Sequence, residues 1–215
     1  MFDWLAVEYS LHRRFFISSL HAVKALFYFL CAGLLLTSCD TEPKTKQMET
    51  LYEGKFLTMV RNGRWEYCER VNNTAAAMIF ACTPEGEVLL VEEYRPPIAA
   101  QSICFPAGLI GDVAPESGSV AAKRELLEET GYEAAEMRYL FTGPSSPGLT
   151  SETVAFYLAS GLVQKSAGGG VEGENITVHK VSMADIDAWL AEQMSAGKSI
   201  DPRVYTGLYF LKNNG

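Results

Sequence analysis

Residues 117–130 constrain this chain most, because a helix there places three carboxylates on one face. Glu125, Glu128 and Glu129 stand at positions i, i+3 and i+4, which are neighbours on a helix surface. Like charges at this spacing destabilise a helix unless something positive lies among them. Ligation by oxygen alone suits magnesium or manganese, which also bridge substrate phosphates. A solvated acidic helix is the simpler alternative.

Three further residues distinguish this segment from an ordinary acidic helix. Gly131 is placed to end the helix in a left-handed conformation, and Glu116 lies eight residues before Arg124. The whole stretch resembles the Nudix box, G-x5-E-x7-R-E-U-x-E-E-x-G-U, where U is a bulky apolar residue. One departure precedes the helix, since seven residues rather than five separate Gly108 from Glu116. The resemblance implies that Glu116 and Arg124 form an internal ion pair that shapes this loop.

The resemblance to Nudix hydrolases also implies a metal site. Glu125 and Glu129 would be the main ligands of Mg²⁺, Glu128 an additional or shared ligand, and Ala107 would offer its backbone carbonyl. Mn²⁺ is expected as a substitute. The metal would polarise the diphosphate and lower the pKa of an attacking water.

Beyond the box, nearly all of residues 50–215 resemble the ADP-ribose and ADP-sugar pyrophosphatase branch of this family. The matching segments are Gly54-Lys55-Phe56, Trp65-Glu66, Glu93-Tyr94-Arg95-Pro96-Pro97 and residues 105–110, 146–152 and 200–205. Cys104 departs from the branch, which commonly has Glu there. The resemblance implies hydrolysis of ADP-ribose or a related ADP-sugar to AMP and a sugar phosphate. The alternatives are another Nudix substrate, such as GDP-mannose or a dinucleotide cofactor, and a module that binds nucleotides without cleaving them.

The substrate-binding candidates are Phe56, Trp65, Arg70, Arg95, Leu109 and Glu152. Trp65 offers a face on which an adenine can stack, and Phe56 could supply the opposite face. Arg95 is suited to grip a phosphate with two hydrogen bonds, and Arg70 could assist near the nucleotide. Glu152 is interpreted as a contact of the ribose or of the metal site. In isolation the two aromatic residues would more often be packing residues and Arg95 a surface charge, but the surrounding motifs favour binding.

The resemblance places the general base in the glycine-rich loop 168–174. A loop that carries acids could close over substrate and place a carboxylate on the nucleophilic water. Glu174 ranks first because it precedes the apolar run 175–178 as the family's catalytic acid precedes its strand, and Glu172 ranks second. A flexible surface hairpin is the alternative, and for Glu172 it is nearly as favoured.

The charge of the chain excludes one class of partner. The net charge is −8, and because residues 1–47 carry five Lys/Arg and four Asp/Glu, residues 48–215 carry −9. A body this acidic repels phosphate polymers, so a nucleic-acid-binding protein is not expected. A small phosphate compound can still bind if bound cations reverse the negative charge locally.

The branch resemblance implies a homodimer whose N-terminal strands pack across the interface, so that Trp65 would serve the partner's site.

Residues 1–47 form a segment of distinct character. A basic region precedes an apolar run over 25–36, and Leu36-Thr37-Ser38-Cys39 resembles a bacterial lipobox with Cys39 as the lipidated residue. An uncleaved anchor and an extension upstream of a start at Met48 are the alternatives. Free cysteines in the body and a nucleotide-like substrate favour the cytoplasm, whereas the lipobox favours a membrane-anchored lipoprotein. Membrane contact is expected only through this segment.

The remaining pattern predicts a Nudix α/β/α sandwich with a mixed sheet, preceded by an N-terminal β-hairpin region. Strands are expected over 51–60, 64–71, 75–83, 88–94, 137–142, 152–160 and 175–182, and helices over 117–130, 183–195 and 201–213. Asn62-Gly63 predicts a hairpin turn, and Ser182 an N-cap. The domains are therefore 1–47 (signal-like or extension segment with a polar linker), 48–74 (hairpin region) and 75–215 (Nudix hydrolase domain).

Overall fold

The computed structural model describes residues 48–71, 75–111, 114–171 and 173–214. The chain divides after Lys46 into two units, and everything described below belongs to the second. The predictions for residues 1–47, including lipidation of Cys39, and for Glu172 lie outside the described residues. Within the described ranges, no helix combines the length and the apolar character needed to cross a membrane.

The described chain begins with a three-stranded antiparallel sheet of β1 (Glu49–Glu53), β2 (Leu57–Asn62) and β3 (Trp65–Arg70), in that order. The single strand expected over 51–60 is divided by a turn, in which the Gly54 N–H donates to the Leu57 carbonyl at 2.9 Å. The hairpin between β2 and β3 is present, but its turn residues are Gly63 and Arg64. Gly63 has φ of 64°, as the first central residue of a type II′ turn requires.

Two four-stranded mixed sheets form the rest of the fold. One has the order β10-β5-β6-β11, with β5 (Glu87–Arg95), β6 (Ala100–Cys104), β10 (Thr177–Ser182) and β11 (Ser199–Ile200). The other has the order β7-β4-β9-β8, with β4 (Ala75–Ala81), β7 (Ala107–Leu109), β8 (Tyr132–Pro144) and β9 (Thr153–Gln164). The pairs β4–β9 and β6–β11 are parallel, and the remaining pairs are antiparallel.

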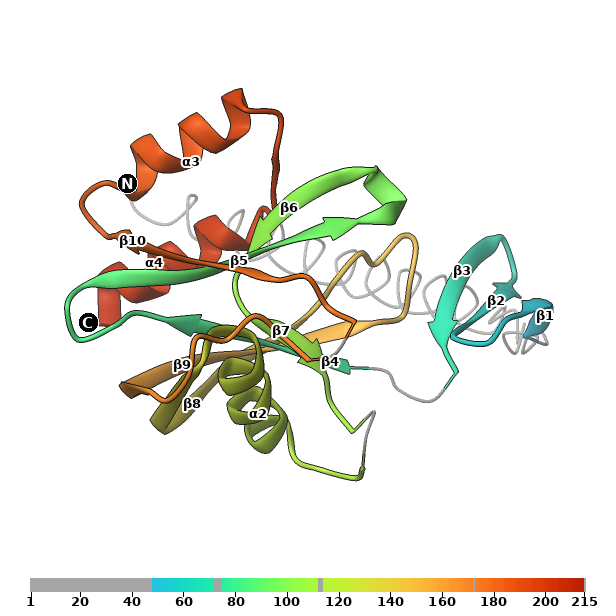
Figure 1. The fold of residues 1–215 in the computed structure, drawn as a ribbon. Coiled ribbons are helices and arrows are strands. Elements are labelled where there is room, and N and C mark those ends of the chain that lie inside the picture. The colour runs from blue at the N-terminus through green and yellow to red at the C-terminus, as the bar shows by residue number, and fades with distance from the viewer. Residues whose placement is uncertain (1–47, 72–74, 112–113, 172, 215) are drawn as a thin grey trace, which may run out of the picture. The chain divides into compact units, whose positions relative to one another are not determined.

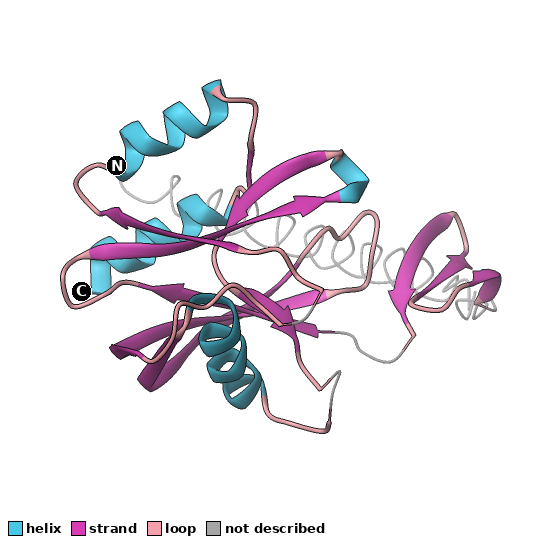
Figure 2. Cartoon of the chain, in the orientation of Figure 1, coloured by secondary structure: helices cyan, strands magenta, loops and turns pink. Residues whose placement is uncertain are grey.

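Helices cover the two outer sides of these sheets, which confirms the predicted sandwich (Figures 1 and 2). Helix α2 (Gly118–Thr130) packs against β8 and β4, while α3 (Ile186–Ser195) lies at the opposite end of the stack and α4 (Arg203–Asn214) contacts β4. A short 3₁₀ helix, η1 (Pro96–Ile98), links β5 to β6. The N-cap of α3 is Asp185, so the assignment of Ser182 was wrong. The Ser182 hydroxyl instead accepts the Ala184 N–H at 3.2 Å, inside the turn that precedes the helix.

Strand β4 divides the core because its side chains alternate between two faces. Met78 and Phe80 join the cluster that α3 and α4 complete. Ala77 and Ile79 join the second cluster, to which α2 contributes Leu126. The packing of α2 on β4 therefore fixes this helix beside β7, the strand that pairs with β4 and carries residues 107–109.

Candidate active site

Helix α2 carries two glutamates on the stripe that it buries. It ends at Gly131, where φ is 77° and the N–H donates to the Leu127 carbonyl at 2.9 Å, as the sequence predicted. The buried residues of the helix are Ala121, Ala122, Glu125, Leu126, Glu129 and Thr130. Two carboxylates thus lie beside the residues that anchor the helix to the sheet, whereas Glu128 is half-buried. Carboxylates almost never occupy such positions without a charged or metal partner.

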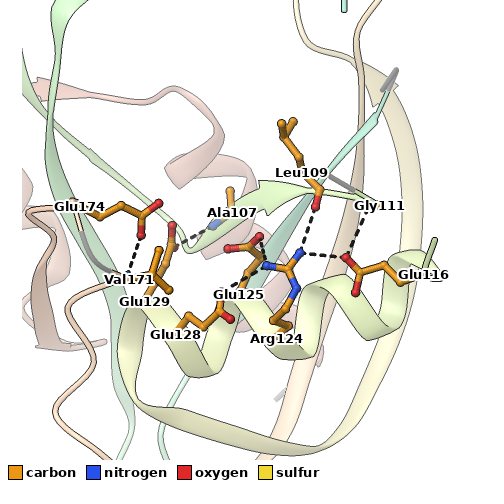
Figure 3. Close-up of polar contacts among 10 residues, drawn as sticks. All are labelled: Ala107, Leu109, Gly111, Glu116, Arg124, Glu125, Glu128, Glu129, Val171 and Glu174. Carbon is orange, nitrogen blue, oxygen red and sulfur yellow. Dashed lines mark hydrogen bonds and ion pairs between the residues drawn. The ribbon is translucent and has the colours of Figure 1, made fainter. Parts of the chain in front are cut away.

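Arg124 connects the carboxylates of this region through its guanidinium group (Figure 3). Its Nη2 donates to Glu116 Oε1 at 2.8 Å and to the Leu109 carbonyl at 3.3 Å. Its Nη1 donates to Glu125 Oε1 at 2.8 Å and to Glu128 Oε2 at 3.2 Å. The hydrogen bond from Arg124 holds the pKa of Glu116 below its usual value. The predicted ion pair with Glu116 is present, and the contacts with Glu125 and Glu128 were not foreseen.

Glu129 lies on the buried side of α2 and is 6% exposed. Its Oε2 accepts the Ala107 N–H at 3.0 Å. Burial raises the pKa of Glu129 to about 8, and the Ala107 hydrogen bond opposes this shift, whereas the nearby Glu125, Glu93 and Glu174 add to it. A carboxylate among others stays ionised only if a cation compensates its charge. The sequence assigned the Ala107 carbonyl to the metal, and the contact seen here is made by the N–H of the same residue.

Strand β7 brings the Gly108 backbone against the Glu125 carboxylate. A Cβ atom built on Gly108 would lie 2.0 Å from both the carboxyl carbon and Oε1 of Glu125. Only a residue without a side chain allows this approach. The two-residue insertion follows Gly108 in the sequence and leaves this contact in place.

The helix glutamates fit a divalent cation by donor type and by charge. Glu125, Glu128 and Glu129 offer oxygen atoms alone, which suits Mg²⁺ or Mn²⁺. Burial raises the pKa of Glu129 and the neighbouring carboxylates raise it further, and a bound cation would favour the ionised form against both effects. As the side chains lie, no three His, Cys, Asp or Glu residues in the described part of the chain are arranged to hold an ion. Ligation of one ion by all three carboxylates would therefore require their side chains to rearrange.

A cavity of about 530 Å³ adjoins this helix through β7. Its volume is in the range of small-molecule sites. It is lined by Arg70, Ala76, Met78, Arg95, Pro97, Ile98, Ser102, Cys104, Ala107, Gly108, Leu109, Glu152, Val154, Asp201 and Arg203. The structure thus brings together five of the predicted site residues, which come from β3, β5, β7 and the loop before β9.

Each of the three arginines in this cavity is held by one carboxylate. The pairs are Arg70 with Glu152, Arg95 with Glu93, and Arg203 with Asp201. The guanidinium Nε of Arg203 donates to Asp201 Oδ1 at 2.9 Å and to Oδ2 at 3.1 Å. Burial raises the pKa of Asp201, but the hydrogen bonds from Arg203 outweigh it and leave the pKa below its usual value. Oriented guanidinium groups suit phosphate recognition.

The sequence did not identify Glu93, Asp201 or Arg203 as site residues. Two of them belong to the segment 200–205, which was matched to the family only as the start of the last helix. The sequence pattern that could have indicated them is an aspartate two residues before an arginine at the start of a helix. The sequence does not show that this helix start lies beside β6 and β7, because only the tertiary fold determines that position.

Cys104 forms part of the cavity wall and is 5% exposed. Burial raises the pKa of its thiol to about 12, so the side chain is uncharged near neutral pH. Where the family branch commonly has a carboxylate, this chain therefore has a neutral group. The three described cysteines, Cys68, Cys82 and Cys104, are free.

Phe56 and Trp65 do not line the cavity. Phe56 is 69% exposed in the turn between β1 and β2, and Trp65 is 54% exposed at the start of β3. Lys55 lies over the Phe56 ring at 4.9 Å and Arg64 over the Trp65 ring at 5.9 Å. Adenine stacking on these rings stays a prediction, and the cavity formed by one chain does not include them.

Glu174 lies near Glu129, on the side of α2 that faces the segment following β9 (Figure 3). Its Oε2 accepts the Val171 N–H at 3.0 Å. The two carboxylates interact electrostatically, as the pKa shift of Glu129 shows. The first-ranked candidate base and a candidate metal ligand thus lie together, while Glu172 is outside the described residues.

Comparisons with known proteins agree with this arrangement. Residues 72–199 match the NUDIX domain. The chain is 30% identical over 151 residues to an ADP-ribose pyrophosphatase of Bacillus subtilis (strain 168), which covers 67% of this chain and 80% of that protein. It is 33% identical over 137 residues to a methanol dehydrogenase activator of Bacillus methanolicus (61% and 73%), and 31% identical over 147 residues to a GDP-mannose pyrophosphatase of Escherichia coli (strain K12) (65% and 73%).

The fold itself has a counterpart among solved structures. The crystal structure of an ADP compounds hydrolase superposes with a TM-score of 0.56 at 21% identity, covering 77% of this chain and 90% of that chain. The NUDIX match spans α2 together with β4 and β7, so the glutamate helix occurs in the fold that normally carries it. The chain therefore belongs to the Nudix family of hydrolases.

Proposed function

We propose that the protein cleaves the diphosphate of ADP-ribose or a related ADP-sugar, using Mg²⁺ and giving AMP and a sugar phosphate. The observation that carries the proposal is the continuity of the glutamate helix with the arginine-lined cavity. Ala107 lines the cavity and donates its N–H to Glu129, so a diphosphate held there would lie beside the helix glutamates. Similarity to a protein named ADP-ribose pyrophosphatase supports the choice of substrate.

The arginines of the cavity would bind and orient the diphosphate. A divalent cation held by Glu125, Glu128 and Glu129 would polarise the phosphates and lower the pKa of an attacking water. Arg95 can offer two parallel N–H donors to one phosphate. Its ion pair with Glu93 restrains the guanidinium before substrate arrives, which lowers the entropy lost on binding.

Glu174 would accept the proton from the attacking water. A carboxylate has acceptor capacity on both oxygens, so it can hold the Val171 N–H and a water together. Glu172 is the second candidate for this role. A positioned base of this kind contributes about 10²- to 10⁴-fold to the rate.

Glu129→Gln tests the proposal because it keeps the shape of the side chain and removes its charge. We expect Mg²⁺-dependent AMP release from ADP-ribose to fall by about 10²-fold or more, as for loss of a key charge-stabilising group. Glu136→Gln is the matched control, since Glu136 is exposed on β8, away from the helix glutamates. Unchanged turnover in Glu129→Gln would contradict the metal assignment.

A second candidate is hydrolysis of another nucleoside diphosphate, such as GDP-mannose or a dinucleotide cofactor. Similarity to a protein named GDP-mannose pyrophosphatase favours GDP-mannose among these. Among the described residues, none with an aromatic side chain lines the cavity, so these residues offer no ring there to stack on a particular base. A substrate panel with ADP-ribose, GDP-mannose and NAD separates the two candidates by kcat/KM. Binding without product at saturating Mg²⁺ would favour a non-catalytic binding module instead.

The protein is also proposed to act as a homodimer in the cytoplasm. Exposed apolar side chains gather on the N-terminal sheet and the residues beside it, namely Met48, Tyr52, Phe56, Leu57, Met59 and Trp65. Large exposed apolar surfaces of this kind mark interaction sites. Light scattering of the full chain tests the dimer.

Intact mass and cell fractionation test the proposed location in the cytoplasm, since lipidation of Cys39 would place the protein on a membrane.

A further inference from the structure

The segment between β9 and Glu174 runs across the C-terminal end of helix α2. The N–H groups of Lys165 and Ser166 donate to the Gly131 carbonyl at 2.7 and 3.2 Å. The N–H groups of Gly169 and Gly170 donate to the carbonyls of Glu129 and Glu128 at 2.9 and 3.0 Å. The last carbonyls of a helix have no partners within the helix, so this segment, residues 165–170, supplies them.

The contact between the segment and the helix is made backbone to backbone. A Cβ atom on Gly131 would lie 2.3 Å from the Ser166 carbonyl oxygen. A Cβ atom on Gly168 would lie 2.4 Å from the Thr130 carbonyl carbon and 2.6 Å from the Glu129 oxygen. These neighbours are backbone atoms that cannot turn aside, so a side chain on either glycine must push the segment away. Gly131 therefore ends the helix and also leaves room for the docked segment.

The docked segment leads directly to the candidate base. Gly170 is followed by Val171, whose N–H binds the Glu174 carboxylate at 3.0 Å. A Cβ atom on Gly170 would lie 2.5 Å from Glu174 Oε2 and 2.9 Å from Glu174 Cβ. The backbone carbonyls of Glu128 and Glu129, two predicted metal ligands, are thus joined to the Glu174 carboxylate through three consecutive residues, 169–171.

We propose that segment 165–170 is a positioning device, and that Gly168 is its positioning residue, which sets the Glu174 carboxylate against the metal-binding helix. The inference rests on the proposed function, because it takes Glu174 as the base for a water activated at that helix. It also explains why glycine stands at positions 131 and 168, where the residue itself has no functional group. If the segment only capped α2, its loss would change stability and leave the chemical step unaffected.

Gly168→Ala separates these two roles. Its φ is 72°, so the substitution adds left-handed backbone strain as well as the clash. Gly86→Ala is the matched control, because Gly86 has φ of 82° and no atom lies within 4 Å of its added Cβ. Gly170→Ala is a second variant that displaces Glu174 directly, because the added Cβ would meet Glu174 Oε2 at 2.5 Å and Glu174 Cβ at 2.9 Å, and its φ of 83° adds backbone strain like that at Gly168.

The experiment measures kcat and KM for ADP-ribose, Mn²⁺ affinity, and amide hydrogen exchange of residues 165–171 in the full chain. For Gly168→Ala we expect faster exchange in this segment and a kcat about 10- to 100-fold lower, with KM and Mn²⁺ affinity within twofold of the unsubstituted protein. Gly170→Ala should lower kcat similarly. Gly86→Ala should leave kcat unchanged.

Two results would overturn the proposal. Faster exchange with unchanged kcat would show that the segment only caps the helix, and unchanged exchange in Gly168→Ala would show that it is not docked through this contact. If Gly168→Ala does not fold, an unchanged kcat in Gly170→Ala overturns the proposal by itself. Failure of the proposed function is distinguishable, because the unsubstituted protein would then release no AMP.

Discussion

Replacing Gly108 by alanine tests whether the close approach of β7 to α2 matters for activity. The added Cβ would lie 2.0 Å from Glu125 Oε1, and ordinary contact begins at 3.4 Å, so the carboxylate must retreat by about 1.4 Å. Misplacement of a reacting group by about 1 Å costs about 10²-fold in rate. We therefore expect kcat/KM of Gly108→Ala to fall by about 10²-fold. Stability should change by only about 1 kcal/mol, because the group that moves is the end of a side chain.

The assay is Mg²⁺-dependent AMP release together with thermal unfolding of the same preparations. Gly143→Ala is the matched control, because its Cβ would make only ordinary contacts, with Phe141 at 3.8 Å and Phe156 at 4.0 Å. The magnesium concentration at half-maximal rate should rise in Gly108→Ala, since Glu125 is displaced from its place beside Glu129. A folded variant with full kcat/KM would refute the assignment of Glu125 to the metal site.

Three further substitutions test other parts of the structure. Glu92 binds His179 at 2.7 Å and Lys198 at 2.8 Å, and although burial raises its pKa, these partners leave the pKa below the usual value. Its stabilising effect is therefore complete above the ordinary glutamate pKa and is lost as the pH falls through the lowered one. In chemical denaturation, Glu92→Gln should lower the free energy of unfolding by about 1–3 kcal/mol at pH 7 and by progressively less below pH 4.5. Arg203→Met should raise KM for ADP-ribose by about 10-fold or more and lower Tm, because it leaves the Asp201 carboxylate without its partner, and an unchanged KM would remove Arg203 from the substrate site. Trp65→Ala should raise KM in a protein that light scattering shows to be dimeric, and an unchanged KM would contradict stacking on this ring.

The local features of the site could be predicted because they depend on neighbours in the sequence. The helix of 117–130 begins one residue later and ends where Gly131 was expected to end it. The Glu116–Arg124 pair was implied by the resemblance to the Nudix box, and the structure contains it. The hairpin at Gly63 was predicted from a glycine that favours the turn, although the turn residues are shifted by one.

Features that depend on distant segments could not be predicted in the same way. Strands β6, β7 and β11 were missed because they are short and exist only through their pairing with β5, β4 and β6. The Arg124 contacts with Glu125 and Glu128 depend on a side-chain rotamer that spacing does not determine. The docking of Gly168 on α2 depends on where the chain returns after β9, and no local pattern encodes that return.

The net negative charge of residues 48–215 does not indicate how the cavity could bind a phosphate compound. Residues 48–215 carry a net −9, and a bound cation was expected to be what reverses this charge locally. In the structure Arg70 and Arg95, which the sequence named as candidates, meet Arg203, which it did not, in one cavity. Each is already paired with a carboxylate, but a guanidinium group has five N–H donors and a carboxylate uses two of them at most in a bidentate pair. A phosphate can therefore bind the remaining donors without displacing the acid, so the carboxylates restrain the arginines for binding rather than compete with the substrate.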